Sequence, residues 1–156
     1  MREVVLNDYE VERNKPLPSL NHALVQSRLI VALSVRYADR YNIASELSLD
    51  LFDWPSVPDV SIFPFAPLNL REDVVAVTEP PLGVVEIISP TQSLNSLVEK
   101  AGLYFAHGVR SVWLVLLPLG SVVVFSAPER HQTFEARETL VDDVLDIRLE
   151  LGAVFS

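Results

Sequence analysis

The sequence predicts a mixed α/β (α+β) fold, in which a mixed β-sheet is flanked by helices. Two stretches have helical spacing: near residues 19–40, His22, Gln26, Leu29 and Leu33 share one face, and residues 94–105 carry an apolar stripe. Between them, residues 83–88 form an apolar run interrupted only by Glu86, which is typical of a central strand buried on both faces. Of the 156 residues, 49% are hydrophobic and 21% are charged. This composition argues against disorder, and the length predicts a single domain over residues 1–156.

The first predicted elements are a helix and two strands. Ser19 or Asn21 can cap a helix that continues to about Arg40. From Asn42 the period changes to two, which predicts a strand up to Leu51. A turn at residues 53–55 leads into a second short strand over residues 57–63.

The middle of the sequence predicts a loop, the central strand and a second helix. Residues 64–81 contain four prolines and predict a loop or flap, with a brief strand over 74–77. After the central strand, a hydroxyl at residues 89–91 can cap a helix that continues to about His107, and Gly108 supplies its stop. The apolar stripe of this helix comprises Leu94, Leu97, Val98, Ala101, Tyr104 and Phe105.

The last part of the sequence predicts a β-hairpin and a final strand. Two β-rich runs, at residues 112–117 and 122–126, are joined by a Pro-Leu-Gly turn. Alternation at residues 147–151 predicts the final strand. The strand–helix–strand unit over residues 83–117 predicts a parallel crossover, and the hairpin adds an antiparallel edge at residues 122–125.

Charge and cysteine content limit the classes of function. The chain has no cysteine, which excludes disulfides and thiolate metal sites and agrees with a reducing compartment such as the cytoplasm. No apolar run is long enough for a membrane helix, so we expect no membrane association. The net charge of −9 argues against tight DNA binding by a bare monomer, although bound metal ions would reduce the repulsion locally.

Two acidic residues occupy predicted strands, Asp59 in the second strand and Glu86 in the central one. A carboxylate inside an apolar strand is costly unless a cation or several donors pair with it. Magnesium takes oxygen ligands and commonly uses one or two carboxylates together with water and phosphate. Asp59 and Glu86 therefore indicate a Mg²⁺ or Mn²⁺ site suited to phosphodiester chemistry.

Lys100 and three further residues are candidate contributors to this site. Lys100 lies at the border of the apolar stripe of its helix, so its side chain can bend toward the sheet and stabilise charge on a phosphate. Glu46 could add a third acid, and His22 and Gln26 could orient water or substrate from the first helix.

Each candidate also has a purely structural interpretation. Asp59 follows a proline and could be a turn residue, and Lys100 could extend along apolar surface with its charge in water. Glu46 could lie on a solvated strand face, and His22 could cap its helix. Glu86 is harder to explain in this way, because an acid in a Val-Val-Glu-Ile-Ile run needs a buried partner or an edge position.

Taken together, these motifs resemble the bacterial Uma-two family of restriction endonucleases. The resemblance rests on Val-Pro-Asp59, on Val-Val-Glu86-Ile-Ile-Ser-Pro-Thr, on Glu-Lys100 followed by Tyr-Phe, and on Gly108-Val-Arg-Ser-Val-Trp. It covers nearly the whole chain. The family is similar to the PD-(D/E)xK nuclease superfamily, which implies a restriction-endonuclease-like fold with Asp59 and Glu86 as metal-binding acids.

The sequence departs from the superfamily pattern at one position. The lysine expected two residues after the second acid is Ile88 here, and the resemblance suggests that Lys100 takes over its role. The leading hypothesis is a Mg²⁺- or Mn²⁺-dependent endonuclease that acts on DNA as a homodimer. The alternative is a catalytically inactive binding or assembly module with a nuclease-like fold, motivated by the negative charge and the displaced lysine.

Overall fold

A six-stranded mixed sheet forms the centre of the computed structural model, which describes residues 17–156. The first sixteen residues of the predicted domain lie outside the described residues. The strands, in spatial order, are β1 (Tyr41–Ser45), β4 (Val60–Pro64), β6 (Gly83–Ile87), β7 (Ser111–Leu116), β8 (Ser121–Ala127) and β9 (Arg130–Phe134). Only β6 and β7 run parallel, and every other neighbouring pair is antiparallel. The predicted mixed sheet is confirmed.

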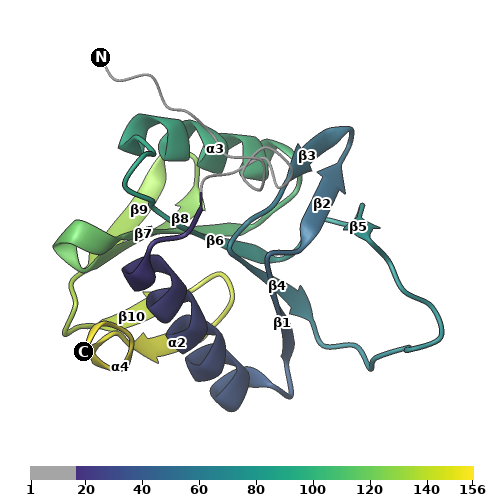
Figure 1. Cartoon of the computed structure of the whole chain (residues 1–156), viewed down its shortest axis with the longest axis horizontal. Helices are drawn as coiled ribbons and strands as arrows, with labels where there is room; N and C mark the ends of the chain where they lie inside the picture. The colour runs from purple at the N-terminus through teal and green to yellow at the C-terminus, as the bar shows by residue number, and fades with distance from the viewer. Residues whose placement is uncertain (1–16) are drawn as a thin grey trace.

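Helices cover both faces of this sheet (Figure 1). One face packs against α2 (Leu20–Tyr37), the short α4 (Gly152–Phe155) and the two-stranded sheet of β10 (Thr139–Asp142) and β11 (Ile147–Glu150). The other face packs against α3 (Leu94–Ala106) and against β2 (Ser48–Leu51). That strand forms a second, three-stranded sheet with β3 (Trp54–Ser56) and β5 (Ala76–Val77). A single 3₁₀ turn, η1 (Leu117–Leu119), joins β7 to β8.

Helix α2 begins at the predicted cap and ends earlier than predicted. Ser19 Oγ accepts a hydrogen bond from His22 N at 3.2 Å, which satisfies one of the unpaired amides of the first turn. Leu29 and Leu33 are completely buried against the sheet. The helix ends at Tyr37 instead of Arg40. None of the helices within residues 17–156 is both long and apolar enough to cross a membrane.

The single strand predicted over residues 43–51 is two strands in two different sheets. β1 pairs with β4 in the central sheet, whereas β2 pairs with β3 and β5. The chain changes sheet at Glu46, which has a left-handed φ of 52°. An alternating pattern does not reveal such a break, because apolar residues on both strands keep the same period. The following strand β4 begins at Val60, so that Asp59 directly precedes it.

Helix α3 begins later than predicted. Ser93, and not a hydroxyl at residues 89–91, caps it by accepting a hydrogen bond from Ser96 N at 3.1 Å. Leu97, Ala101 and Tyr104 turn toward the sheet and are almost completely buried. These three positions confirm part of the predicted apolar stripe and set the angular position of Lys100 beside it, whereas Leu94 and Val98 are exposed.

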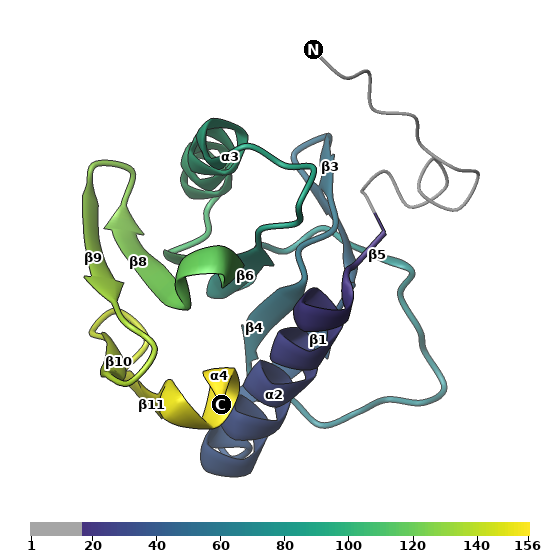
Figure 2. The same cartoon turned by 60° about the vertical axis from the view of Figure 1, so that its left-hand side comes forward.

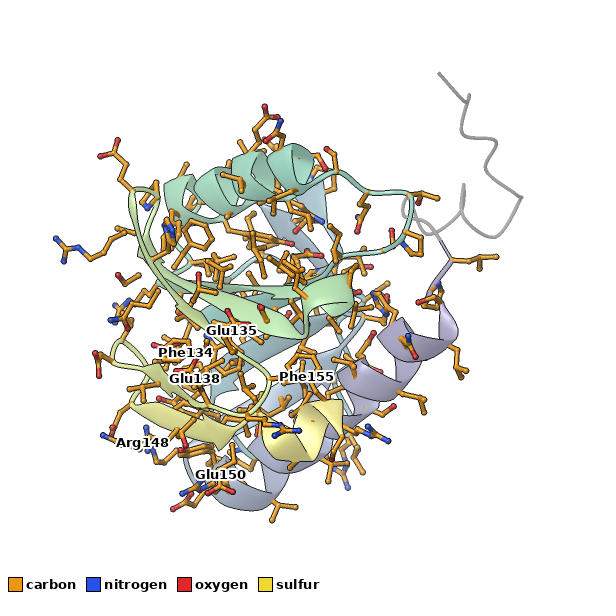
Figure 3. All side chains as sticks on the ribbon, turned by 90° about the vertical axis from the view of Figure 1, so that its left-hand side faces the viewer. Phe134, Glu135, Glu138, Arg148, Glu150 and Phe155 are labelled. Carbon is orange, nitrogen blue, oxygen red and sulfur yellow. The ribbon has the colours of Figure 1, made fainter. Side chains whose placement is uncertain are left out.

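The predicted edge of the sheet at residues 122–125 is wrong. β8 lies between β7 and β9, so β9 is the edge strand. The sequence of β9, Arg-His-Gln-Thr-Phe, lacks the apolar alternation that identifies a half-buried strand, because most of its side chains face solvent. Figure 3 views the end of the molecule formed by β9, β10, β11 and α4, where Glu135, Glu138 and Glu150 lie.

A buried aspartate fixes the β10–β11 hairpin to the central sheet. Asp142 is 1% exposed, and its Oδ2 accepts hydrogen bonds from Ser111 Oγ at 2.5 Å and from Trp113 Nε1 at 2.8 Å. Its Oδ1 accepts from the backbone amides of Val144 and Leu145 at 2.9 and 3.0 Å. Four donors therefore satisfy this carboxylate, which makes it a structural group.

We expect Asp142→Ala to destabilise the protein by about 3 kcal/mol or more, because it leaves buried donors without an acceptor. The matched control is Asp143→Ala, which removes the adjacent exposed carboxylate and should change stability by less than about 0.5 kcal/mol. Urea unfolding followed by circular dichroism measures both. Equal midpoints for the two variants would contradict a structural role for Asp142.

Candidate functional site

The two predicted acids are both buried, Asp59 directly before β4 and Glu86 on the neighbouring strand β6. Asp59 is 1% exposed and Glu86 is 2% exposed. β4 and β6 pair antiparallel, with Val60 opposite Val85 and Ser61 opposite Val84. One further step in this register brings Asp59 opposite Glu86, and side chains opposite each other on antiparallel strands begin about 5 Å apart. The fold therefore brings the two acids to the same end of one strand pair.

Glu86 is held by two side chains from α3. Lys100 Nζ lies 2.9 Å from Glu86 Oε1, and Tyr104 donates a hydrogen bond to the same oxygen at 2.7 Å. The two α3 residues are four positions apart, so they occupy the same face of the helix, one turn from each other. Lys100 is 28% exposed at its side chain and thus connects the buried acid to solvent. The interpretation that Lys100 extends along apolar surface with its charge in water is therefore wrong, because its ammonium group contacts Glu86.

Asp59 is held from the opposite direction. Its Oδ2 accepts a hydrogen bond from the backbone amide of Ile87 at 2.7 Å, and His22 Nε2 lies 3.2 Å from the same oxygen. His22 is in the first turn of α2 and is 3% exposed, because the helix starts directly against this end of the sheet. The interpretation of His22 as a capping residue is therefore wrong, because Ser19 caps the helix and His22 is buried.

The remaining two candidates, Gln26 and Glu46, gather around the backbone of Asp59. Gln26 Nε2 donates to the carbonyl oxygen of Asp59 at 3.0 Å and to Glu46 Oε1 at 3.4 Å. The amide of Glu46 donates to the same carbonyl at 3.2 Å. All six candidate residues are thus joined into two contact groups, one around Asp59 and one around Glu86, on adjacent strands.

Sequence reasoning assigned Tyr104 only to the core, and the structure adds a polar role. Its ring packs edge-on against Trp54 with centroids 5.0 Å apart, while its hydroxyl reaches Glu86. Burial, followed by the negative charge of Glu86, raises the pKa of Tyr104 above its ordinary value. The hydroxyl therefore stays protonated and remains a donor. Tyr104 lies four residues after Lys100 and so shares its helix face, and this spacing could have identified Tyr104 as a second partner of Glu86 from the sequence.

We expect Tyr104→Phe to cost about 1–3 kcal/mol of stability and to weaken metal binding about 10- to 100-fold, because Glu86 loses a donor that orients it. Tyr37→Phe is the control, since it removes a hydroxyl that bonds Arg148 on the far side of the sheet. Calorimetric titration of Mn²⁺ and urea unfolding measure the two effects. A weaker metal affinity in both variants would show that the effect is general destabilisation.

The donor atoms present suit a hard divalent cation. Two carboxylates are the usual protein contribution to a Mg²⁺ site, with water and phosphate as the other ligands. Within residues 17–156, no group of three or more His, Asp or Glu side chains is placed to hold a metal ion. A metal at Asp59 and Glu86 would therefore rely on these two acids and on oxygens from solvent or substrate.

A comparison with protein families decides the family. The model of the Uma2 family, described as "Putative restriction endonuclease", matches residues 5–153. The chain belongs to the Uma2 family. This confirms the resemblance drawn from the motifs around Asp59, Glu86 and Lys100.

Solved structures agree with the fold of this Uma2 protein. It is similar to a crystal structure of a "putative nuclease belonging to DUF820" from Anabaena variabilis, with a TM-score of 0.77 and 22% identity. The match covers 90% of this chain and 83% of that one. No curated protein matches the chain. At this identity the likeness establishes the fold, and the restriction-endonuclease-like architecture is confirmed.

The position of the expected superfamily lysine is occupied by a partly buried apolar residue. Ile88 packs beside the apolar cluster between the sheet and α3, and its amide donates to the carbonyl of Val115 at 3.0 Å. The only lysine among the described residues, Lys100, instead reaches Glu86 from α3. The Uma2 chain thus has a lysine next to its second acid, although the lysine comes from a different element.

Proposed function

We propose that this protein is a Mg²⁺- or Mn²⁺-dependent endonuclease that hydrolyses phosphodiester bonds of DNA. Its family and fold support a nuclease. The observation that carries the proposal is the contact of Lys100 Nζ with Glu86 Oε1 at 2.9 Å, beside Asp59 on the neighbouring strand. Two buried acids and one partly exposed cation at the same strand end are the groups that metal-assisted phosphodiester hydrolysis requires.

Each residue has a distinct part in this proposal. Asp59 and Glu86 would hold the metal, which when bound polarises a phosphoryl oxygen and lowers the pKa of a water molecule. Lys100 would direct its ammonium group at the negative charge that builds on the phosphate. His22 and Gln26 would fix Asp59 through its carboxylate and its carbonyl, and Glu46 would support Gln26.

The negative charge of the chain limits where DNA can bind. The chain carries a net charge of −9, and Glu135, Glu138 and Glu150 lie at the end shown in Figure 3, where Arg148 also lies. Acids that outnumber this arginine disfavour phosphate there, so we propose that DNA binds at the strand end that carries Asp59 and Glu86, where a divalent ion would offset the repulsion. We further propose that the protein works in the cytoplasm, as one domain over residues 1–156, and pairs as a homodimer to cut both strands.

Calorimetric titration of Mn²⁺ tests the metal site. We expect binding to the wild-type protein and at least about a 100-fold loss of affinity in Asp59→Ala, because one of two protein ligands is missing. Asp143→Ala, which removes an exposed acid elsewhere, should bind as the wild type does. Circular dichroism shows that each variant is folded. Equal affinity in the wild type and in Asp59→Ala would contradict the assignment.

The alternative of an inactive binding module makes a different prediction. In such a module the donors around Asp59 and Glu86 would serve only to satisfy two buried acids. Cleavage of plasmid and single-stranded DNA in Mn²⁺ or Mg²⁺, lost in site variants, excludes that module. Absence of cleavage, combined with absence of metal binding even when a short duplex is present, supports it.

A further inference from the structure

The loop between β4 and β5 leaves a set of apolar side chains in solvent. We call residues 65–75 the arm. Its exposed apolar residues are Phe65 at 54%, Leu68 at 87%, Leu70 at 89%, Val74 at 59% and Val75 at 89%. The views in Figures 1 and 2 both show this loop projecting from the sheet on the right-hand side. A concentration of apolar side chains in one exposed segment is typical of a surface that binds another molecule.

The arm is fixed at its base. Phe65 N donates to the carbonyl of Arg40 at 2.9 Å, and Asn42 Nδ2 donates to the carbonyl of Ala66 at 2.8 Å. At its far end, β5 pairs with β2. Both ends of the arm are therefore held by strands, and its apolar side chains are presented from a defined position.

A complementary groove lies on the outward face of α2. A cavity of about 430 Å³ is lined there by Val31, Ala32 and Val35 of α2 and by Ala153 of α4, with Arg28 and Arg36 also lining it. We call these residues the α2 groove. Val31 is 60% exposed and Val35 is 82% exposed, so the arm of the same chain does not cover them.

The charges of the arm and the groove are opposite. Between its two apolar pairs the arm carries Arg71, Glu72 and Asp73, which give it a net charge of −1, whereas the groove carries Arg28 and Arg36 around its apolar centre. Arg28 donates to the backbone oxygens of Val154 and Ser156, and Arg36 to that of Arg148. A guanidinium group has five N–H donors, so both arginines keep donors that suit an acidic segment.

We propose that the arm of one copy docks into the α2 groove of a second copy of this chain. A reciprocal exchange gives a closed two-fold dimer in which each copy contributes one arm and one groove. The apolar residues of the arm cover Val31 and Val35, and its acids face Arg36. This proposal does not depend on the nuclease chemistry, because neither surface includes Asp59, Glu86 or Lys100.

Analytical ultracentrifugation of the full chain and of two variants tests the proposal. Val75→Asp alters the arm and Val35→Asp alters the groove, and both positions are so exposed that the fold should not change. We expect a wild-type dimer and at least about a tenfold larger dissociation constant in each variant. Leu119→Asp is the control, since Leu119 is 70% exposed on η1 and should leave the dimer unchanged. A monomeric wild type, or a dimer that neither variant weakens, overturns the proposal.

Mixing the two variants tests reciprocity. A heterodimer of Val75→Asp with Val35→Asp retains one intact arm–groove contact, so we expect mixing to restore association in part. A charge exchange gives a second readout. Arg36→Glu should weaken the dimer, and the additional change of Glu72→Arg with Asp73→Arg should recover it. No recovery in either experiment contradicts a direct arm–groove contact.

Discussion

Replacing Glu86 is expected to abolish cleavage while leaving the fold intact. In the proposed role of Glu86 as a metal ligand, its replacement should lower the cleavage rate at least about 100-fold, since removing groups that only support a ligand already costs about 10- to 100-fold. Glu86→Gln is the sharper variant, because its amide oxygen can still accept the hydrogen bond from Tyr104. Glu86→Ala should lose the same activity and also about 1–3 kcal/mol of stability, because the buried Tyr104 hydroxyl loses its acceptor.

The matched control for Glu86 is Glu99→Gln on the exposed side of α3. It makes the same chemical change in a solvated glutamate, so we expect wild-type cleavage and stability. The assay is metal-dependent nicking of supercoiled plasmid, with folding followed by circular dichroism. Undiminished cleavage by folded Glu86→Gln would remove Glu86 from the site.

Lys100→Met should separate catalysis from metal binding. The methionine keeps most of the length of the side chain but not its charge, so we expect the rate constant kcat to fall about 100- to 1,000-fold. The affinity for Mn²⁺ should not fall, because Glu86 is released from its ion pair with Lys100. Single-turnover kinetics at saturating Mn²⁺ and calorimetry measure the two quantities.

Lys100→Arg is the informative companion variant. It keeps the positive charge but replaces a compact ammonium group with a planar guanidinium, so we expect activity between that of wild type and Lys100→Met. Equal, full activity in Lys100→Met and wild type would show that the ion pair only satisfies the buried Glu86. In that case the displaced lysine has no catalytic role.

The central strand and the second helix could be predicted because their patterns have a single explanation. A glutamate inside Val-Val-Glu-Ile-Ile needs a partner wherever the strand lies, and Lys100 borders an apolar stripe with clear helical spacing. The contact between the two follows from the parallel crossover that places α3 against β6. This part of the candidate site could be derived from local pattern and topology.

The other parts of the fold and of the candidate site depend on features that the pattern of apolar and polar residues does not reveal. The change of sheet at Glu46 depends on one left-handed residue within an otherwise alternating segment. β9 faces solvent and so carries no apolar period, which led to the wrong edge strand. The burial of His22 against Asp59 depends on how α2 meets the sheet, and contacts between residues 37 positions apart are not visible in sequence spacing.

The exposed loop between β4 and β5 separates the residues of the candidate site into two groups in the sequence. Residues before the loop supply His22, Gln26, Glu46 and Asp59, while residues after it supply Glu86, Lys100 and Tyr104. A single proteolytic cut in this loop would leave the two proposed metal-binding acids on separate polypeptides, joined by the pairing of β4 with β6 and of β2 with β5, by hydrogen bonds and by packing. Metal binding would then report directly on whether two fragments reassemble, which makes this protein a natural candidate for a split reporter.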